Sequence, residues 1–220
     1  TRCADVTGVQ TCALPIYVQT RRCPGRRPPK RAAMRLFVGI NFPKKQRAKV
    51  HRAARALRDR ELPVRWIEPD NFHVTLKFLG EVRREQVDGV TAAIERAAAS
   101  TRPFQTEIGG FGAFPTVRRP NVIWLGVEAC PELRCLKQDL EWALGDAGFP
   151  AESRSFHPHV TLGRAQDSGG AGAFRELDGV FASLQFEDEL KVHSIELMRS
   201  HLSRDGARYS VISSVRLGST

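Results

Sequence analysis

The sequence predicts an α+β fold in which helices pack outside antiparallel or mixed β-sheets. Segments with the composition or alternation of β-strands are separated by segments with helical periodicity. Long helices between strands indicate that the helices lie on the outside of the sheets. A His-Val-Thr-Leu motif also occurs twice on predicted strands, at 73–76 and at 159–162.

The elements of the first half follow from residue spacing. Pro43 opens a predicted helix, and a second helix precedes residue 100, each with an apolar stripe at helical spacing. The two stripes consist of Val50, Ala53, Ala54 and Leu57, and of Val87, Val90 and Ile94. Strands are predicted for 34–40, 64–67, 72–79 and 104–114, with Gly80 ending the third and glycines interrupting the last.

The second half repeats this pattern of strands and helices. Residues 121–127 and 157–162 are predicted strands, and Pro131 opens a helix that Gly148 stops. The apolar stripe of that helix is Leu133, Leu136, Leu140 and Leu144. We expect a short helix within 171–184 and a closing hairpin of 192–198 and 209–217, turned at Asp205-Gly206.

Residues 1–33 differ from the rest of the chain. They hold seven Lys or Arg residues and one Asp, so they carry +6 of the net charge of +10, and residues 34–220 carry +4. This segment lacks periodicity and is rich in Pro and Arg near its end, which predicts a disordered leader. Residues 6–16 are also similar to the translation of a common sequencing adapter. We therefore interpret the leader as an assembly artefact, with a basic RNA-binding arm as the alternative, and expect the native chain to begin at Met34.

The cysteines and the hydropathy exclude several classes of protein. Cys3, Cys12 and Cys23 lie in the leader, which leaves Cys130 and Cys135 without a CxxC pair, so a zinc ribbon or a disulfide framework is not supported. We expect two free thiols in a reducing cytoplasm. No apolar run reaches the roughly 18 residues of a membrane span.

The repeated motif is the main functional signal. Side chains alternate between the faces of a strand, so His73 and Thr75 share one face, as do His159 and Thr161, with the intervening valines on the other. Two such strands facing each other would place two imidazoles and two hydroxyls around one pocket. One imidazole can be neutral and the other cationic near pH 7, which suits a general base and a general acid. Threonine hydroxyls can bind phosphate oxygens. The set predicts phosphodiester chemistry without a metal, although the residues alone do not say which histidine is the acid.

His157 and His159 form an alternative, metal-binding pair, but the sequence offers no third ligand at suitable spacing. Other candidates are weaker. Arg164 could neutralise a phosphate or form a surface ion pair. Lys77 is expected at the rim of the site, because alternation places it on the His73 face.

Aromatic and basic residues near the motifs could contact RNA. The candidates for base stacking are Phe72, Phe78, Phe114 and Trp124, although aromatic residues on strands usually belong to the core. Arg118 and Arg119 could contact an RNA backbone or form a solvated turn. We interpret the arginine-rich segment 52–60 as the solvated face of a helix.

Longer stretches around both motifs carry a family resemblance. They are 66–82, 111–115, 120–127, 156–164 and 195–202, followed by Gly206 and Tyr209. In this order they resemble the 2H phosphoesterase superfamily, and within it the bacterial RNA 2′,3′-cyclic phosphodiesterases, also called the 2′-5′ RNA ligase family. The resemblance covers about 34–217.

The resemblance implies a two-lobed, pseudo-symmetric fold in which each lobe brings one histidine motif to a central cleft. Residues 34–220 would form a single bilobal domain. The implied activity is hydrolysis of a 2′,3′-cyclic phosphate at an RNA 3′ end to a 2′-phosphate, without a cofactor. His73 would donate a proton to the leaving 3′ oxygen, His159 would accept a proton from water, and Thr75 and Thr161 would hold the phosphate.

Two alternatives keep this fold and change the function. One is a phosphodiesterase of small cyclic nucleotides, and the other is an RNA-binding module without catalysis. The intact His and Thr residues of both motifs favour an enzyme, because binding alone does not require two titratable groups. We expect a cytoplasmic monomer with no metal, no membrane association and no obligate protein partner, whose partner is RNA with a 2′,3′-cyclic phosphate end.

Overall fold

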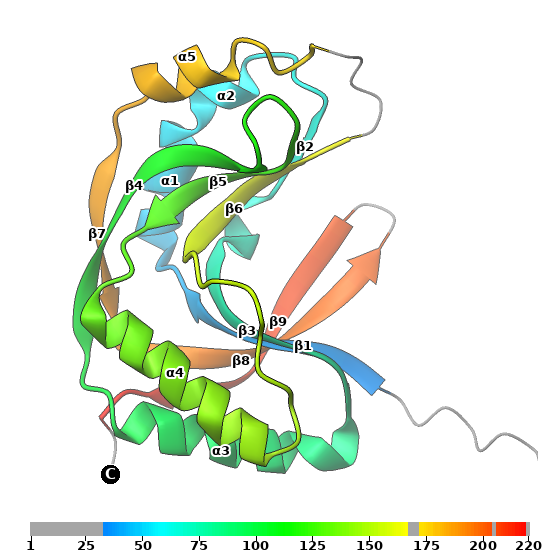
Figure 1. The fold of residues 1–220 in the computed structure, drawn as a ribbon, viewed down its shortest axis with the longest axis vertical. Helices are drawn as coiled ribbons and strands as arrows, with labels where there is room; N and C mark the ends of the chain where they lie inside the picture. Colours follow the sequence, from blue (N-terminus) through cyan, green and yellow to red (C-terminus); the bar gives the residue numbers. More distant parts are fainter. Residues whose placement is uncertain (1–32, 167–171, 204–205, 219–220) are drawn as a thin grey trace, which may run out of the picture. The chain divides into compact units, whose positions relative to one another are not determined.

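All nine β-strands of the described residues, which are 33–166, 172–203 and 206–218, form one antiparallel sheet (Figure 1). The computed structural model orders them β7-β4-β5-β6-β3-β1-β8-β9, and β2 pairs with β6. The bounds are β1 Ala33–Asn41, β2 Val64–Trp66, β3 His73–Arg83, β4 Phe104–Pro115, β5 Pro120–Val127, β6 His159–Ala165, β7 Glu187–Val192, β8 Ser194–Ser203 and β9 Gly206–Arg216. The predicted α+β class is confirmed.

The sheet consists of two similar halves. One half has the order β3-β1-β8-β9 and the other has the order β6-β5-β4-β7. The halves join where Val74 of β3 pairs with Val160 of β6. Each histidine motif therefore lies on the innermost strand of its own half, and the two motifs meet at the junction.

Two of the helices each follow a strand of one half and contact an element of the other half. The helix bounds are α1 Lys44–Ala53, α2 Arg55–Arg58, α3 Val87–Ala99, α4 Pro131–Asp146 and α5 Leu177–Ser183, with 3₁₀ turns η1 Pro69–Asn71 and η2 Arg84–Gln86. Helix α1 follows β1 but is bonded to β7, through Lys49 Nζ to Asp188 (2.8 Å) and Gln46 Nε2 to the Glu189 carbonyl (2.6 Å). Helix α4 follows β5 but packs against α3 and β3 (Figure 1). These crossovers connect the two halves through one core.

The predicted apolar stripes face the core, with Ala53 and Val87 only partly buried. Val50, Leu57 and Ile94 are fully buried in the core, as are all four leucines predicted for α4. Val74, Leu76, Val160 and Leu162 also lie in this core, so the core face of both motif strands was predicted correctly. No helix within the described residues is long and apolar enough to cross a membrane.

Several strand assignments differ from the prediction. Gly80 does not end β3, which continues to Arg83, because its positive φ of 71° is accommodated at a register shift against β1. The glycines of β4 likewise do not interrupt it, since Gly110 has φ 73° at another register shift. Strand β7 was missed, because its Glu-Asp-Glu-Leu-Lys-Val sequence is mostly charged on the exposed face.

Some predictions concern residues outside those that the structure describes. They include residues 1–32 of the leader predicted for 1–33, the three cysteines found there, and Asp205 of the predicted hairpin turn. Ala33 was wrongly assigned to the leader, because it is the first residue of β1. Cys130 and Cys135 are both free, the first buried and the second exposed.

Candidate active site

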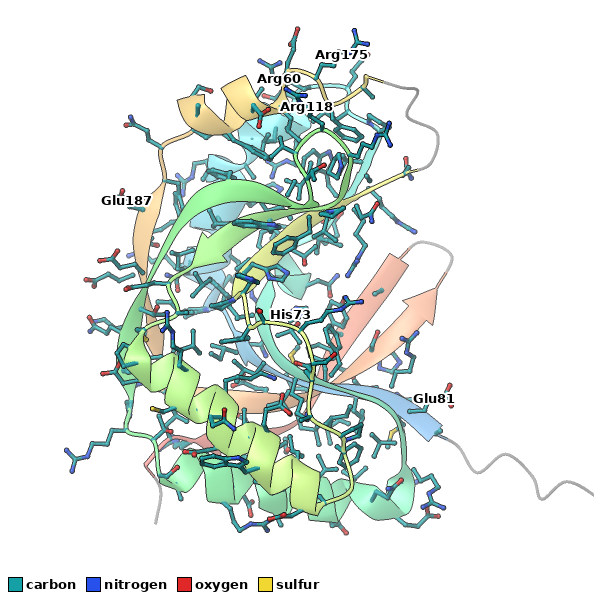
Figure 2. All side chains as sticks on the ribbon, in the orientation of Figure 1. Arg60, His73, Glu81, Arg118, Arg175 and Glu187 are labelled. Atoms are coloured by element: carbon teal, nitrogen blue, oxygen red, sulfur yellow. The ribbon has the colours of Figure 1, made fainter. Side chains whose placement is uncertain are left out.

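The histidine and threonine side chains of the two motifs lie on the face of the sheet opposite the main core. The antiparallel pair Val74–Val160 lies between them, so His73 and Thr161 flank it on one side and Thr75 and His159 on the other. His73 lies in the middle of the molecule as drawn (Figure 2). His73 and His159 are thus neighbours across the junction, and the positive charge of His159 acts to lower the pKa of His73.

Both imidazoles are oriented by the same hydrogen bond. Nδ1 of His73 lies 2.7 Å from the carbonyl oxygen of Asn71, and Nδ1 of His159 lies 2.7 Å from that of His157. A carbonyl oxygen only accepts hydrogen bonds, so each Nδ1 carries the proton. Nε2 is then left as the atom that exchanges a proton with a ligand, as a base when neutral and as an acid when protonated.

The surroundings of both histidines favour the neutral imidazole. The pKa of His73 is lowered to about 4, chiefly by burial. The positive charges of His159, Arg47 and Arg164 act in the same direction, and the hydrogen bond to the Asn71 carbonyl opposes them. Burial also lowers the pKa of His159, with Arg164 and His157 acting in the same direction against the His157 carbonyl. An anionic ligand would reverse these effects, because a negative charge stabilises the imidazolium.

The predicted phosphate-binding residues lie around these imidazoles. Thr75 and Thr161 are half-buried on the histidine face, and their hydroxyls form no hydrogen bond within the described part of the chain. Arg164 is exposed, has no carboxylate at ion-pair distance among the described residues, and is close enough to lower the pKa of both histidines. These three residues can therefore donate hydrogen bonds to an anion between the imidazoles.

A β-bulge follows each motif and changes which side chains reach the site. Consecutive residues of β1 pair with Thr75 and Lys77, and consecutive residues of β5 pair with Thr161 and Gly163. The leucine of each motif is thus an extra residue, and the alternation reverses after it. This reversal directs Phe78 and Arg164, at equivalent positions of the two motifs, to the histidine face.

The expectation for Lys77 was wrong because of this bulge. Lys77 is 0% exposed and points away from the histidines, where its Nζ contacts the Glu141 carboxylate and the Pro150 carbonyl (2.8 Å). Lys137 contacts the same carboxylate and lies 2.8 Å from Glu152. This buried ion cluster attaches β3 to α4 and takes no part in the site.

The aromatic candidates separate into core and site residues. Phe72 is buried in the core, which excludes it from base stacking. Phe78 is 65% exposed, and its ring is 6.1 Å from that of Phe37, which in turn is 4.8 Å from His73. Phe114 and Trp124 lie beside His159, with ring centroids 5.2 and 6.3 Å from the imidazole.

Tyr209 and Asn71 are site residues whose roles the sequence did not reveal. The Tyr209 ring lies edge-on to His73 at 4.7 Å, although it is contributed by β9. Asn71 holds that strand in place, because its Oδ1 accepts from the Tyr209 backbone N–H and its Nδ2 donates to the Ala207 carbonyl, both at 3.3 Å. Neither role was detectable in the sequence, since β9 and His73 are far apart along the chain and come together only in the folded protein.

Other candidates lie elsewhere or lack partners. Arg118 and Arg119 are exposed, and Arg118 is well separated from His73 (Figure 2). Among the described residues, no three His, Cys, Asp or Glu side chains are arranged to hold a metal ion, so no third ligand joins His157 and His159.

Comparison with known proteins identifies similar chains. The model of the 2′-5′ RNA ligase superfamily matches residues 42–204. RNA 2′,3′-cyclic phosphodiesterase of Aeropyrum pernix is 36% identical over 162 residues, which cover 72% of this chain and 89% of the relative. The protein of that name from Aquifex aeolicus is 33% identical over 188 residues, which cover 84% and 98%.

Solved structures share the fold. A Thermus thermophilus protein superposes with a TM-score of 0.70 at 28% identity, covering 84% of this chain and 98% of that one. E. coli LigT complexed with 3′-AMP gives a TM-score of 0.66 at 25% identity, covering 86% and 100%.

Proposed function

The chain belongs to the 2′-5′ RNA ligase superfamily, and on that basis we propose that it hydrolyses the 2′,3′-cyclic phosphate at the 3′ end of RNA, leaving a 2′-phosphate. Several relatives that match most of the chain are named RNA 2′,3′-cyclic phosphodiesterase. The observation that carries the proposal is the pair of imidazoles with Nδ1 bonded to a carbonyl and Nε2 left for proton exchange.

In the proposed reaction, water attacks phosphorus while the bond from phosphorus to the 3′ oxygen breaks. His159 Nε2 takes a proton from the water, and His73, protonated at Nε2, donates a proton to the leaving 3′ oxygen. One proton is taken and one is given, so the pair returns to its starting charge with the proton on the other histidine. Each transfer contributes about 10²–10⁴ to the rate.

The phosphate itself supplies the charge that this mechanism needs. In the free protein the pKa of His73 is about 4, so the imidazole is neutral at pH 7. A bound cyclic phosphate monoanion raises that pKa, and protonated His73 then serves as the acid. Thr75, Thr161 and Arg164 bind the non-bridging oxygens and hold phosphorus between the two Nε2 atoms.

The proposed mechanism uses no metal or other cofactor, because the two imidazoles handle both protons. The partner that it requires is RNA ending in a 2′,3′-cyclic phosphate. That the protein is a cytoplasmic monomer without an obligate protein partner stays a prediction.

The test is hydrolysis in EDTA of a cyclic-phosphate-ended oligoribonucleotide beside 2′,3′-cyclic mononucleotides, with the product identified by ³¹P NMR. We expect a 2′-phosphate from the oligonucleotide. Turnover of mononucleotides alone would favour the small cyclic nucleotide alternative, and binding without turnover would favour the RNA-binding module. Activity that is lost in EDTA and restored by a divalent ion would contradict the metal-free mechanism.

A further inference from the structure

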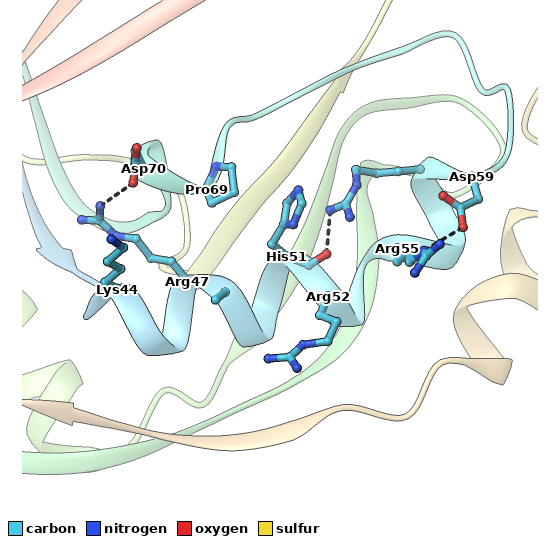
Figure 3. Close-up of a pocket in the computed structure, with 10 residues that line it drawn as sticks. Lys44, Arg47, His51, Arg52, Arg55, Asp59, Pro69 and Asp70 are labelled. Atoms are coloured by element: carbon cyan, nitrogen blue, oxygen red, sulfur yellow. Dashed lines mark hydrogen bonds and ion pairs between the residues drawn. The ribbon is translucent and has the colours of Figure 1, made fainter.

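One face of α1 and α2 forms a basic groove that the proposed reaction does not use (Figure 3). Residues 44–59 contribute to it at helical spacing, and Pro69 and Asp70 of η1 line it on the other side. The opposite face of the same helices is buried through Val50 and Leu57 or bonded to β7 through Lys49. The cations of the groove are Lys44, Arg47, Arg52, Arg55 and Arg58.

These cations outnumber the carboxylates around them. Arg47 pairs with Asp70 at 3.5 Å and Arg55 pairs with Asp59 at 3.3 Å, and Glu68 is close enough to raise the pKa of Arg58 against the lowering that burial causes. Asp70 is 93% exposed, and exposed ion pairs of this kind contribute little stability.

The groove therefore has an excess of positive charge that is not neutralised internally. Within the described residues, Lys44 and Arg52 have no carboxylate at ion-pair distance, and both are exposed. Arg58 is used in part by the fold, since its guanidinium donates to the His51 carbonyl (2.6 Å) at the end of α1. The sequence-based interpretation of 52–60 as a solvated face is thus incomplete, because the arginines line a groove.

The groove approaches the candidate active site at Arg47 and Asp70. Arg47 lines the groove, yet its positive charge lowers the pKa of His73. Its Nε is buried and has no hydrogen-bond partner among the described residues. Asp70, which Arg47 contacts, precedes Asn71, whose carbonyl orients His73. An RNA strand whose 3′ end lies at His73 would thus pass Arg47 first and then the remaining cations of the groove.

We propose that this groove binds backbone phosphates of the RNA on the 5′ side of the cyclic phosphate. The inference rests on the proposed function, because it takes the RNA 3′ end to lie at His73 and His159. Single strands are held by basic grooves that follow the backbone, and such contacts are strongly salt-dependent. From Lys44 to Arg58 the helices extend about 20 Å at 1.5 Å per residue, enough for a few nucleotides.

The test compares the double variant Lys44→Glu/Arg52→Glu with Arg96→Glu/Arg134→Glu. The control has the same charge change and also alters one residue in a first helical turn and one in a last, but on α3 and α4. The substrates are 2′,3′-cyclic UMP and oligouridylates of increasing length that end in a cyclic phosphate. KM and kcat are measured over a range of salt concentrations, and melting temperatures establish that both variants fold.

We expect KM of the wild-type protein to fall with oligonucleotide length. The groove variant should raise KM for the long substrates several-fold while the ratio of its KM to the wild-type value stays near one for cyclic UMP. For the long substrates, the slope of log KM against log salt concentration should be smaller in the groove variant than in the wild-type protein by about 1.4. Each phosphate contact to a single strand contributes about 0.7 to this slope.

Failure of the groove and failure of the proposed function give different results. If cyclic UMP and oligonucleotides are both hydrolysed but the groove variant behaves like the control, the groove inference is wrong and the proposed function stands. Equal loss of activity on cyclic UMP and on long substrates also overturns the groove inference. If the wild-type protein hydrolyses neither substrate, the proposed function itself is wrong.

Discussion

Val74 is paired with Val160, and this single pair joins the two halves of the sheet between the two histidine motifs. Both valines are fully buried, so the strands are fixed at this point. His73 and His159 extend from the residues next to the pair, one on each side of it. The spatial relation of the two imidazoles is therefore set by a backbone pairing and by the core beneath it.

The first prediction concerns the two histidines as a unit. His73→Ala and His159→Ala should each lower kcat by about 10²–10⁴, because each removes one proton transfer. The double variant should be little worse than either single one, since groups that act together are non-additive. Single-turnover kinetics and RNA-binding isotherms measure this, with His193→Ala, an exposed residue, as the control. Near-normal turnover by His159→Ala would rule out the two-histidine mechanism.

The second prediction concerns pH and activity. Catalysis needs one neutral and one protonated imidazole, so both kcat and kcat/KM should be bell-shaped in pH. The pKa values of both histidines are lowered in the free protein, to about 4 for His73, so the kcat/KM optimum should lie below pH 6.5. Bound phosphate raises these pKa values, and the kcat optimum should lie at higher pH. Rates from about pH 4 to pH 9 test this, and coincident optima above neutrality would contradict it.

The third prediction concerns pH and stability. The pKa of His73 falls from 6.5 in the unfolded chain to about 4 in the folded protein, so the unfolded state binds more protons between these values. This residue therefore contributes stability above pH 6.5 that is lost as the pH falls towards 4, up to about 3 kcal/mol. His73→Gln should lose less stability on acidification than the wild-type protein. Urea unfolding at both ends of this range measures the difference, and an equal loss in both proteins would show that His73 is not the group responsible.

The fourth prediction concerns Asn71 as a positioning residue. Asn71→Ala removes two side-chain hydrogen bonds to β9 and frees the carbonyl that orients His73. We expect kcat to fall about tenfold, which corresponds to 1.4 kcal/mol in the barrier, with little change in KM. Imidazole ¹⁵N NMR should show His73 losing its fixed Nδ1–H tautomer. A variant with lower stability, normal kcat and an unchanged tautomer would show that Asn71 has a structural role only.

The sequence allowed the α+β class, the apolar stripes of α1, α3 and α4, and the shared face of His73 and Thr75 to be predicted. These features depend on local periodicity, which a sequence records directly. The contribution of Tyr209 depends instead on the tertiary fold, because β1 and β8 separate β9 from β3 in the sheet and Asn71 nevertheless bonds to the Tyr209 backbone. The roles of the Asn71 and His157 carbonyls were equally hidden, because every residue has a carbonyl and only the fold selects these two.

The bulges are the clearest case of information that periodicity lacks. An extra residue at Leu76 reverses the alternation, so a rule that correctly predicted the face of Thr75 gave the wrong face for Lys77 two positions later. The same bulge at Leu162 directs Arg164 to the histidine face, where the family resemblance did not by itself require it.

The last prediction tests the new position of Lys77. Its side chain is fully buried and shares the Glu141 carboxylate with Lys137. Burial raises the pKa of Glu141, but hydrogen bonds from Lys137 and Lys77 outweigh this and hold it below its usual value. Removing one partner of a buried ion pair leaves the other poorly compensated, so Lys77→Ala should lower the free energy of unfolding by about 3 kcal/mol.

Matched variants test whether the stability lost at Lys77 comes from its charge or from its packing, and whether Lys77 belongs to the core or to the active site. Lys77→Met keeps most of the side-chain volume and should be less destabilising than Lys77→Ala, whereas Arg134→Met on the exposed face of α4 should change stability by less than about 0.5 kcal/mol. Urea unfolding measures all three. For the folded fraction of Lys77→Met, KM and kcat should stay within about twofold of wild type, because Lys77 points away from the imidazoles. The opposite result, with KM for the cyclic phosphate raised and stability little changed, would show that Lys77 lies beside His73, as strict alternation predicts.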